Sequence, residues 1–323
     1  LDQGSLLLAP KAVLETCDLL QRLLGSAAAE ADGSSLKLIE ITRAVNLRHL
    51  GFPALIPWPD PEWLHSWRRP LRLRILAHLV QSAADCDEQA ELDYFERARG
   101  QLSAPGEESL EELILLGALG RALAAVRQYP DAAALLRRAV VGFVELGQPY
   151  QASHSFCELC RVQGILGSED PLTASWMQGI ATDPRSPAGQ LSFLRLARGR
   201  SLLQLGRPEL AAEQLDPRAI EHQWRLCPLH VQQSRGRWWA LTLDRLGLPA
   251  EAERERESLS ADTEFRLLAA LDRCLRDEED PGSILEELQQ NQDVGYEIRR
   301  LRRLASAGTL EEQAWVVVAE YRY

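Results

Sequence analysis

The short segment 154–160 holds the residues best suited to chemistry. Cys157 and Cys160 stand three positions apart, and His154 stands three positions before Cys157. Side chains at this spacing share one face of an α-helix, where they could hold zinc or form a redox pair. A closed zinc site needs four ligands, and the sequence has no second Cys-x-x-Cys and no paired histidines. We therefore expect both cysteines to pack in a helical core, with a metal or redox site as the less favoured alternative.

No other pattern in the sequence indicates catalysis. The remaining histidines are dispersed and none stands in His-Glu-x-x-His spacing. No serine lies in a Gly-x-Ser-x-Gly context, and no glycine-rich phosphate loop occurs. We expect a protein that is not an enzyme and that has no catalytic residues, no cofactor and no bound metal.

Basic and aromatic residues are densest between positions 58 and 74. This cluster contains Trp58, Trp63, Trp67, Arg68, Arg69, Arg72 and Arg74. One interpretation is a surface for an acidic peptide or a phosphate, through the paired donors of arginine and stacking on the indoles. The alternative, which we favour, is a solvated helix face whose tryptophans close the end of a helical array.

Composition and charge limit the classes of partner. The chain has 323 residues, of which 46% are hydrophobic, and its formal net charge is −11. That charge argues against a general binder of nucleic acid or of anionic membranes. No apolar run approaches the 18 residues or so that a membrane helix needs, and residues 1–15 lack a basic start followed by an apolar core. We expect a cytoplasmic protein that binds neither nucleic acid nor membrane.

Helix signals mark the first hundred residues. Asp60 followed by Pro61 forms a good helix start, with Trp63 and Trp67 on one face of the helix that follows. Pro70 should break or kink that helix. We expect further helices over 10–24, 36–49, 71–84 and 87–100, followed by a loop over 101–108.

A helical hairpin over 113–147 indicates the architecture. Two runs with helical apolar periodicity flank the turn 127–130, and small residues stand where the two helices would cross. Such a hairpin cannot bury both of its faces alone, so it needs neighbours of the same kind.

The hairpin recurs with a period close to 40 residues. The small residue of the first helix recurs as Gly120, Cys160, Gly199 and Ala240. Seven positions later, the intra-hairpin turn contains Arg127, Gly167, Gly206 and Gly247. Five positions further on, the second helix contains Ala132, Ala211 and Ala252, with Ala174 matching after a two-residue insertion. Together the three columns predict repeated hairpins that cross at small residues.

This column pattern resembles the tetratricopeptide repeat. Segments 206–212 and 247–252 look like the middle of its hairpin, and the resemblance covers about 110–257. A period near 40 is similar to the longer units in the sensor arms of the maltose-operon transcriptional activator and related signalling ATPases. The resemblance implies a right-handed solenoid of helical hairpins that binds a ligand or a protein, and it implies no catalytic residues.

These features predict an all-α fold in three parts. We expect an N-terminal helical cap over 1–60, a solenoid of tetratricopeptide-like hairpins over 61–257, and a C-terminal helical cap over 258–323. The C-terminal cap should contain helices over 262–277, 282–291, 294–307 and 309–321. The run 314–321 is rich in valine, so a short strand is the alternative there.

Arginines of the first helices are the candidate partner-binding residues. In a solenoid of this kind, exposed residues of the first helices line the concave groove. The candidates are Arg121, Arg161, Arg195, Arg198, Arg235 and Arg237, with one tryptophan of the Trp238–Trp239 pair. A basic groove would select an acidic partner by complementarity and steering. The alternative is that these arginines pair with glutamates of adjacent helices.

The expected function is a protein-interaction scaffold or adaptor that holds a peptide or a partner protein in its groove. The alternative is a small-ligand or peptide sensor arm of a larger regulator, by analogy with the signalling ATPases.

Overall fold

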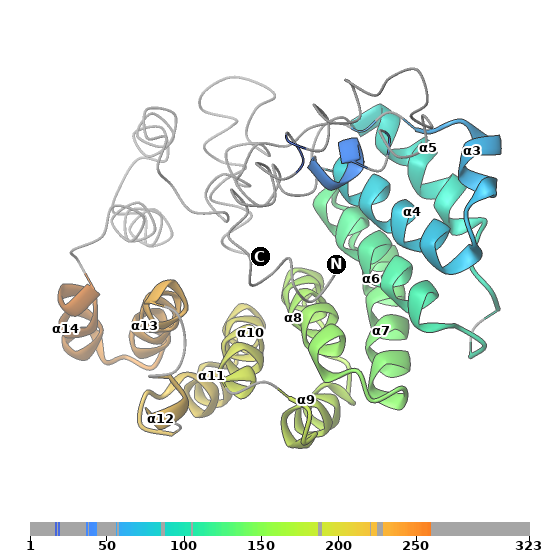
Figure 1. Ribbon diagram of the computed structural model, residues 1–323. Coiled ribbons are helices and arrows are strands. Elements are labelled where there is room, and N and C mark those ends of the chain that lie inside the picture. The colour runs from blue at the N-terminus through green and yellow to red at the C-terminus, as the bar shows by residue number, and fades with distance from the viewer. Residues whose placement is uncertain are drawn as a thin grey trace, which may run out of the picture. The chain divides into compact units, whose positions relative to one another are not determined.

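The computed structural model describes most of the chain between positions 56 and 259 (Figure 1). The described residues are 17, 19, 37, 39–43, 56, 58–84, 88–104, 106–186, 189–219, 221–224 and 229–259. Two compact units divide the chain, one over Leu1–Ser155 and the other over Phe156–Tyr323. Each unit is described by itself below.

Every regular element in the described part of the chain is an α-helix, which confirms the predicted all-α class. The helices of the first half are α3 (Pro61–Ser66), α4 (Arg69–Ala84), α5 (Glu88–Arg99), α6 (Leu110–Ala125), α7 (Tyr129–Glu145) and α8 (Pro149–Leu166). Those of the second half are α9 (Thr173–Thr182), α10 (Gln190–Gln204), α11 (Pro208–Leu215), α12 (Glu221–Trp224), α13 (Leu229–Arg245) and α14 (Pro249–Leu259).

Several predictions fall wholly or mostly outside the described residues. The helices expected over 10–24 and 36–49 are represented only by residues 17, 19, 37 and 39–43, all of which are helical. The four helices expected after position 261, and the choice between helix and strand over 314–321, lie outside the described residues. The predicted boundaries at 60 and 257 stay predictions, because the two caps lie largely in those segments.

The first unit begins with the predicted helix start. Asp60 caps α3, since its Oδ1 accepts the backbone N–H groups of Glu62 (2.7 Å) and Trp63 (3.2 Å). Pro61 occupies the first turn, where the missing N–H costs nothing. The break expected near Pro70 is present, because α3 ends at Ser66 and a new helix, α4, begins at Arg69. Pro70 lies in the first turn of α4, so it helps to start that helix.

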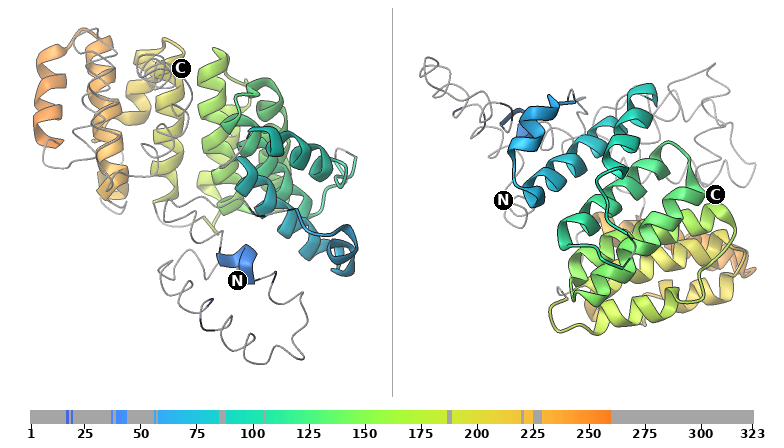
Figure 2. Two further views of the ribbon diagram at one scale, coloured as in Figure 1. Left: turned by 90° about the horizontal axis from the view of Figure 1, so that it is seen from above. Right: turned by 90° about the vertical axis from the view of Figure 1, so that its right-hand side faces the viewer.

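Helices α4 to α7 form the core of the first unit. Helix α4 packs against both α5 and α6, and α6 packs against α7 (Figures 1 and 2). The interface is lined by fully buried leucines such as Leu76, Leu79, Leu116 and Leu136. Burial of a leucine side chain contributes roughly 1.5–3 kcal/mol, so these contacts dominate the stability of the unit.

One turn geometry joins the helices of each hairpin. Arg127, Gly167, Gly206 and Gly247 have backbone φ angles of 65°, 69°, 70° and 77°, all in the left-handed region. Gly147, between α7 and α8, has a φ of 58°. The residue after each of these donates its N–H to a carbonyl five positions earlier, as Arg207 does to Leu202 (2.9 Å). This is the Schellman ending of a helix, and it confirms the predicted turn column.

Small residues lie at the crossings of paired helices, as predicted. A Cβ atom added to Gly120 of α6 would lie 2.6 Å from Leu136 Cγ of α7. A Cβ atom added to Gly199 of α10 would lie 2.5 Å from Leu215 Cγ of α11. Ala240 of α13 is fully buried in one cluster with Ala252 of α14. The helices approach so closely that a larger residue at these positions would displace its neighbour.

The second unit repeats this pairing. Helix α10 packs against α9, α11 and α13, and α13 packs against α14. The left view of Figure 2 shows α10, α13 and α14 side by side with their axes roughly aligned. The paired helices α10–α11 and α13–α14 are consecutive in the chain, and contacts of α10 and α11 with α13 join one pair to the next, which is the arrangement that repeated hairpins require.

The predicted register fails in α9. Ala174 is exposed, whereas Thr173 is buried and its Oγ1 lies 3.3 Å from Gln163 Oε1. Trp176 is buried sixteen positions after Cys160, the same separation as Gly120 to Leu136 and Gly199 to Leu215. Trp176 therefore matches the other hairpins without any insertion, whereas we assumed an insertion of two residues.

None of the helices in the described residues is both long enough and apolar enough to cross a membrane.

Candidate interaction surface

The six candidate arginines lie on α6, α8, α10 and α13, the first helices of the hairpins. None of them belongs to the fully exposed class. Arg161 and Arg237 are buried, with exposed fractions of 8% and 1%. The expectation that all six side chains are exposed is wrong, because helical periodicity identifies the face but not how far neighbouring residues cover it.

Arg161 and Arg198 of the second unit each pair with a glutamate. Arg161 donates to Glu158 Oε1 on its own helix through Nε (3.0 Å) and Nη2 (2.6 Å). Arg198 Nε donates to Glu169 Oε1 (3.2 Å), in the turn that precedes α9. Arg207 donates to the other oxygen of the same carboxylate (3.2 Å). The Glu169 carboxylate thus joins α10 and the turn after it to the segment between α8 and α9.

Arg195 and Arg235 are held by second helices of the same unit. Arg195 Nη2 donates to the backbone oxygen of Glu213 on α11. Arg235 Nη2 donates to Glu255 Oε1 of α14 (3.2 Å), and its side chain is 13% exposed. Burial lowers the pKa of both arginines, while attraction to nearby carboxylates opposes that shift. Arg235 therefore fits the alternative that the candidate arginines pair with glutamates of adjacent helices.

Two arginines stack on one tryptophan. The guanidinium carbon of Arg237 lies 4.5 Å from the ring centroid of Trp238, and that of Arg200 lies 4.9 Å from the same centroid. Trp238 is 2% exposed, so it packs inward on α13. Trp239 is partly buried against the cluster around Ala240. Cation–π contacts of this kind stabilise by about 0.5–2 kcal/mol and orient the arginines across the helix face.

Arg121 is the candidate in the first unit. Its Nε donates to Gln81 Oε1 of α4 (3.2 Å), and its side chain is partly exposed. The ring of His154 on α8 packs edge-on against Tyr150, with centroids 4.8 Å apart. Protein atoms that displace water from this ring, together with the charge of Arg121, lower the pKa of His154 to about 4. His154 is therefore neutral at pH 7.

Our sequence reasoning missed two members of this face, Gln81 and Arg200. Arg121, Arg161 and Arg200 each follow the small residue of their first helix directly, and Gln81 stands 40 positions before Arg121. The same repeat spacing that located the small column could have found these polar residues. Of the two arginines that we predicted on α10, Arg195 and Arg198, the second pairs with Glu169 in the segment before α9.

Cys157 and Cys160 lie on α8 within the second unit. Cys160 is fully buried, and Cys157 Sγ lies 3.8 Å from the carbonyl oxygen of Phe193. Burial raises the pKa of Cys157 to about 12, and the negative charge of Glu158 adds to the shift. Burial also raises the pKa of Cys160 well above its ordinary value. Both thiols are protonated at neutral pH, which disfavours metal ligation and nucleophilic chemistry at this pair.

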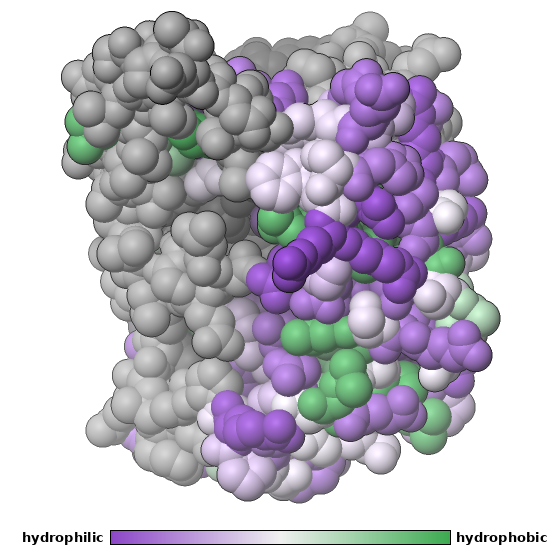
Figure 3. Space-filling model, turned by 45° about the vertical axis from the view of Figure 1, so that its right-hand side comes forward, coloured by the Kyte–Doolittle hydropathy of each residue, from purple (hydrophilic) through white to green (hydrophobic). Residues whose placement is uncertain are grey.

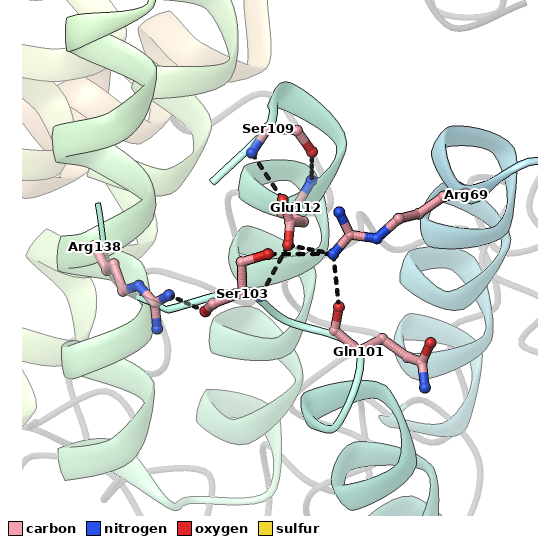
Figure 4. Close-up of polar contacts among 6 residues, drawn as sticks. All are labelled: Arg69, Gln101, Ser103, Ser109, Glu112 and Arg138. Atoms are coloured by element: carbon pink, nitrogen blue, oxygen red, sulfur yellow. Dashed lines mark hydrogen bonds and ion pairs between the residues drawn. The ribbon is translucent and has the colours of Figure 1, made fainter. Parts of the chain in front are cut away.

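The basic-aromatic cluster contributes one arginine to a buried network. Arg69 Nη2 donates to Glu112 Oε1 (2.8 Å) and to the carbonyl of Gln101 (3.4 Å), as Figure 4 shows. Glu112 is 1% exposed and also accepts the backbone N–H groups of Ser103 and Ser109, each at 2.8 Å. This carboxylate fastens the loop before α6 to α4.

Hydrogen bonding decides the charge state of Glu112. Burial alone would raise the pKa of its carboxyl, but the hydrogen bonds from Ser103 and Ser109 outweigh burial and lower that pKa to about 2. Arg138 of α7 adds to the network through the carbonyl of Ser103 (2.9 Å) and through Glu108. The network holds the loop before α6 in place, and the Glu112 carboxylate is fully engaged in it.

Two more members of the cluster have structural contacts. Arg74 pairs with Glu111 of α6 (3.5 Å). Trp58 packs edge-on against Tyr94 with centroids 4.8 Å apart, and Arg97 lies 5.5 Å from the Trp58 ring centroid. Tyr94 in turn donates to the carbonyl of Ile56 (3.0 Å). These contacts match the favoured interpretation of a closing helix face, but only for this half of the cluster.

The surface seen in Figure 3 is mainly hydrophilic in its described part. Hydrophobic residues emerge there as small, separate groups. This side of the described residues thus presents mainly polar and charged groups.

Within the described residues, no group of three or more histidine, cysteine, aspartate or glutamate side chains is placed to hold a metal ion. Comparisons of the chain with protein-family models, curated proteins and solved structures found no match. The function is therefore inferred from the sequence and the contacts of the described residues.

Proposed function

We propose that this protein is a non-catalytic scaffold that binds a protein or peptide partner along the first helices of a tetratricopeptide-like solenoid. The observation that carries the proposal is the repeated hairpin. Four turns share one left-handed residue at matching positions, and the crossings at Gly120, Gly199 and Ala240 recur at the same spacing. Repeats of this kind build extended binding surfaces rather than enclosed catalytic sites.

The first helices supply polar groups for recognition. Arg121 and Arg200 are both partly exposed, and each is oriented by a neighbouring helix of its own unit, through Gln81 and Trp238 respectively. Pre-oriented arginines bind carboxylates with less loss of side-chain entropy than free ones. An acidic partner is therefore the expected class.

Native mass spectrometry of complexes formed by the full chain tests this function. The chain would be used as bait in a lysate of its own organism, and the eluted complex would be weighed without denaturation. A stoichiometric protein or peptide partner is the expected result. A bound small molecule in its place would favour the sensor-arm alternative and contradict the scaffold proposal.

A further inference from the structure

The basic-aromatic cluster divides into a structural half and a half without internal partners. Arg69 and Arg74 pair with glutamates of α6, and Trp58 packs on Tyr94. The other half consists of Trp63, Trp67, Arg68 and Arg72, which we call the α3–α4 patch. All four lie within the fully described stretch 58–84 of the first unit.

The two arginines of the patch have no ion pair with any described residue. Arg68 is exposed and Arg72 is half-buried. The side chains of their neighbours Arg69 and Arg74, by contrast, lie 2.8 and 3.5 Å from carboxylate oxygens. The chain thus neutralises alternate members of the arginine cluster and leaves two positive charges at the surface.

The tryptophans of the patch form a platform with unused donors. Trp63 lies in α3 and Trp67 directly follows the helix, and their ring centroids are 5.8 Å apart in an edge-to-face arrangement. The indole nitrogens of both rings and the Nε atom of Arg72 are covered by neighbouring atoms and have no acceptor among the described residues.

Every unsatisfied group in the patch is a donor or a cation, which defines the complementary partner. Asp60, the acidic residue that precedes α3, already accepts two backbone N–H groups at the helix start. We propose that the α3–α4 patch binds an acidic peptide segment of a partner protein. Its carboxylates pair with Arg68 and Arg72, and its apolar side chains pack on the partly exposed rings of the tryptophan pair.

A peptide fits this patch better than a nucleic acid does. The chain carries a net charge of −11, so a polyanion with one phosphate per nucleotide is repelled by the molecule as a whole. Two cations suffice for two carboxylates of a short peptide. This surface is separate from the first-helix residues Arg121 and Arg200, so the inference goes beyond the proposed function and can fail while that function holds.

Fluorescence anisotropy of the full chain with a labelled peptide of repeated Glu-Glu-Tyr tests the proposal. We expect saturable binding that weakens as salt is raised, because exposed charges are screened. The double variant Arg68→Glu with Arg72→Glu should bind at least about tenfold more weakly, since it converts attraction into repulsion. Trp63→Ala with Trp67→Ala removes the aromatic surface on which the peptide packs, and it should bind about threefold or more weakly.

Matched controls make the outcome decisive. Arg245→Glu with Arg254→Glu changes the net charge equally at two exposed arginines of α13 and α14, and it should leave the affinity unchanged. A Lys-Lys-Tyr peptide and an oligothymidylate of similar length serve as alternative ligands, and thermal melts confirm that each variant folds. The proposal is overturned if the wild-type chain does not bind the acidic peptide, or if both arginine variants weaken binding equally. It is also overturned if oligothymidylate binds more tightly than the acidic peptide and the Arg68→Glu, Arg72→Glu variant loses that oligothymidylate binding.

Discussion

Gly199 of α10 and Leu215 of α11 meet so closely that a single added carbon would overlap. The ideal Cβ position on Gly199 lies 2.5 Å from Leu215 Cγ and 2.8 Å from its Cδ2. Gly120 and Leu136 repeat this relationship in the first unit. Close approach of the paired helices in these two hairpins is therefore set by the absence of a side chain at Gly120 and Gly199.

Replacement of Gly199 by leucine should destabilise the protein. The new side chain would overfill the crossing with Leu215, at an expected cost of about 1–3 kcal/mol in the free energy of unfolding. The double variant Gly199→Leu with Leu215→Ala should recover part of the loss, because the alanine vacates the occupied volume. Urea denaturation measures both variants, and an unchanged melting temperature for Gly199→Leu would show that the crossing is assigned wrongly.

Arg127→Gly should stabilise the hairpin of α6 and α7. Arg127 has a φ of 65°, whereas the three equivalent turns use glycine. A non-glycine residue in the left-handed region costs about 1–2 kcal/mol, so glycine should raise the unfolding free energy by up to about 1 kcal/mol after its larger unfolded-state entropy is counted. The reciprocal change Gly206→Ala should lower it. If both changes shift stability in the same direction, the turn geometry is not the cause.

Glu112 should make stability depend on pH in the acid range. Its pKa falls from 4.5 to about 2 on folding, so the carboxylate contributes stability above pH 4.5 and loses it as the pH falls towards 2. The shift corresponds to about 3 kcal/mol as an upper bound. Glu112→Gln should remove most of this contribution at pH 7, and the two proteins should converge near pH 2. Urea melts at several pH values check this, and a constant difference across the range would contradict it.

The cysteines of α8 should be inert. Because burial raises the pKa of Cys157 to about 12 and that of Cys160 well above its ordinary value, neither presents a thiolate at pH 8. We expect no labelling of the buried Cys160 by a disulfide reagent until urea unfolds the chain, and only slow labelling of the partly exposed Cys157. We expect Cys157→Ser with Cys160→Ala to retain the fold and partner binding. Stoichiometric zinc in protein purified without added metal would refute a purely structural role.

The helix starts and the left-handed helix endings were predicted correctly from the sequence. Arg127, Gly167, Gly206 and Gly247 were located by spacing alone, since a helix ending that needs a left-handed residue leaves a mark at one position. Asp60 with Pro61 was found in the same way, from capping chemistry confined to a few neighbouring residues. Signals of this kind can be read from a single sequence because they do not depend on which helices lie nearby.

Burial of the arginines could not be predicted in the same way. Arg237 is covered and stacked on Trp238, and Arg235 reaches Glu255 twenty positions further along the chain. Helical periodicity assigned both to a face, but the degree of cover depends on packing between hairpins. The error at Ala174 has a different cause, because the two-residue insertion that we assumed shifts every later residue of α9 around the helix axis.

Partner affinity for variants of the first and second helices tests the central claim most directly. Once a partner is isolated, its dissociation constant would be measured for Arg121→Ala with Arg200→Ala and for Glu209→Ala with Glu253→Ala, two exposed glutamates of second helices. The scaffold account predicts that the arginine pair weakens binding at least about tenfold and that the glutamate pair leaves it unchanged. Equal affinity in both variants, or loss confined to the glutamate pair, would contradict binding along the first helices.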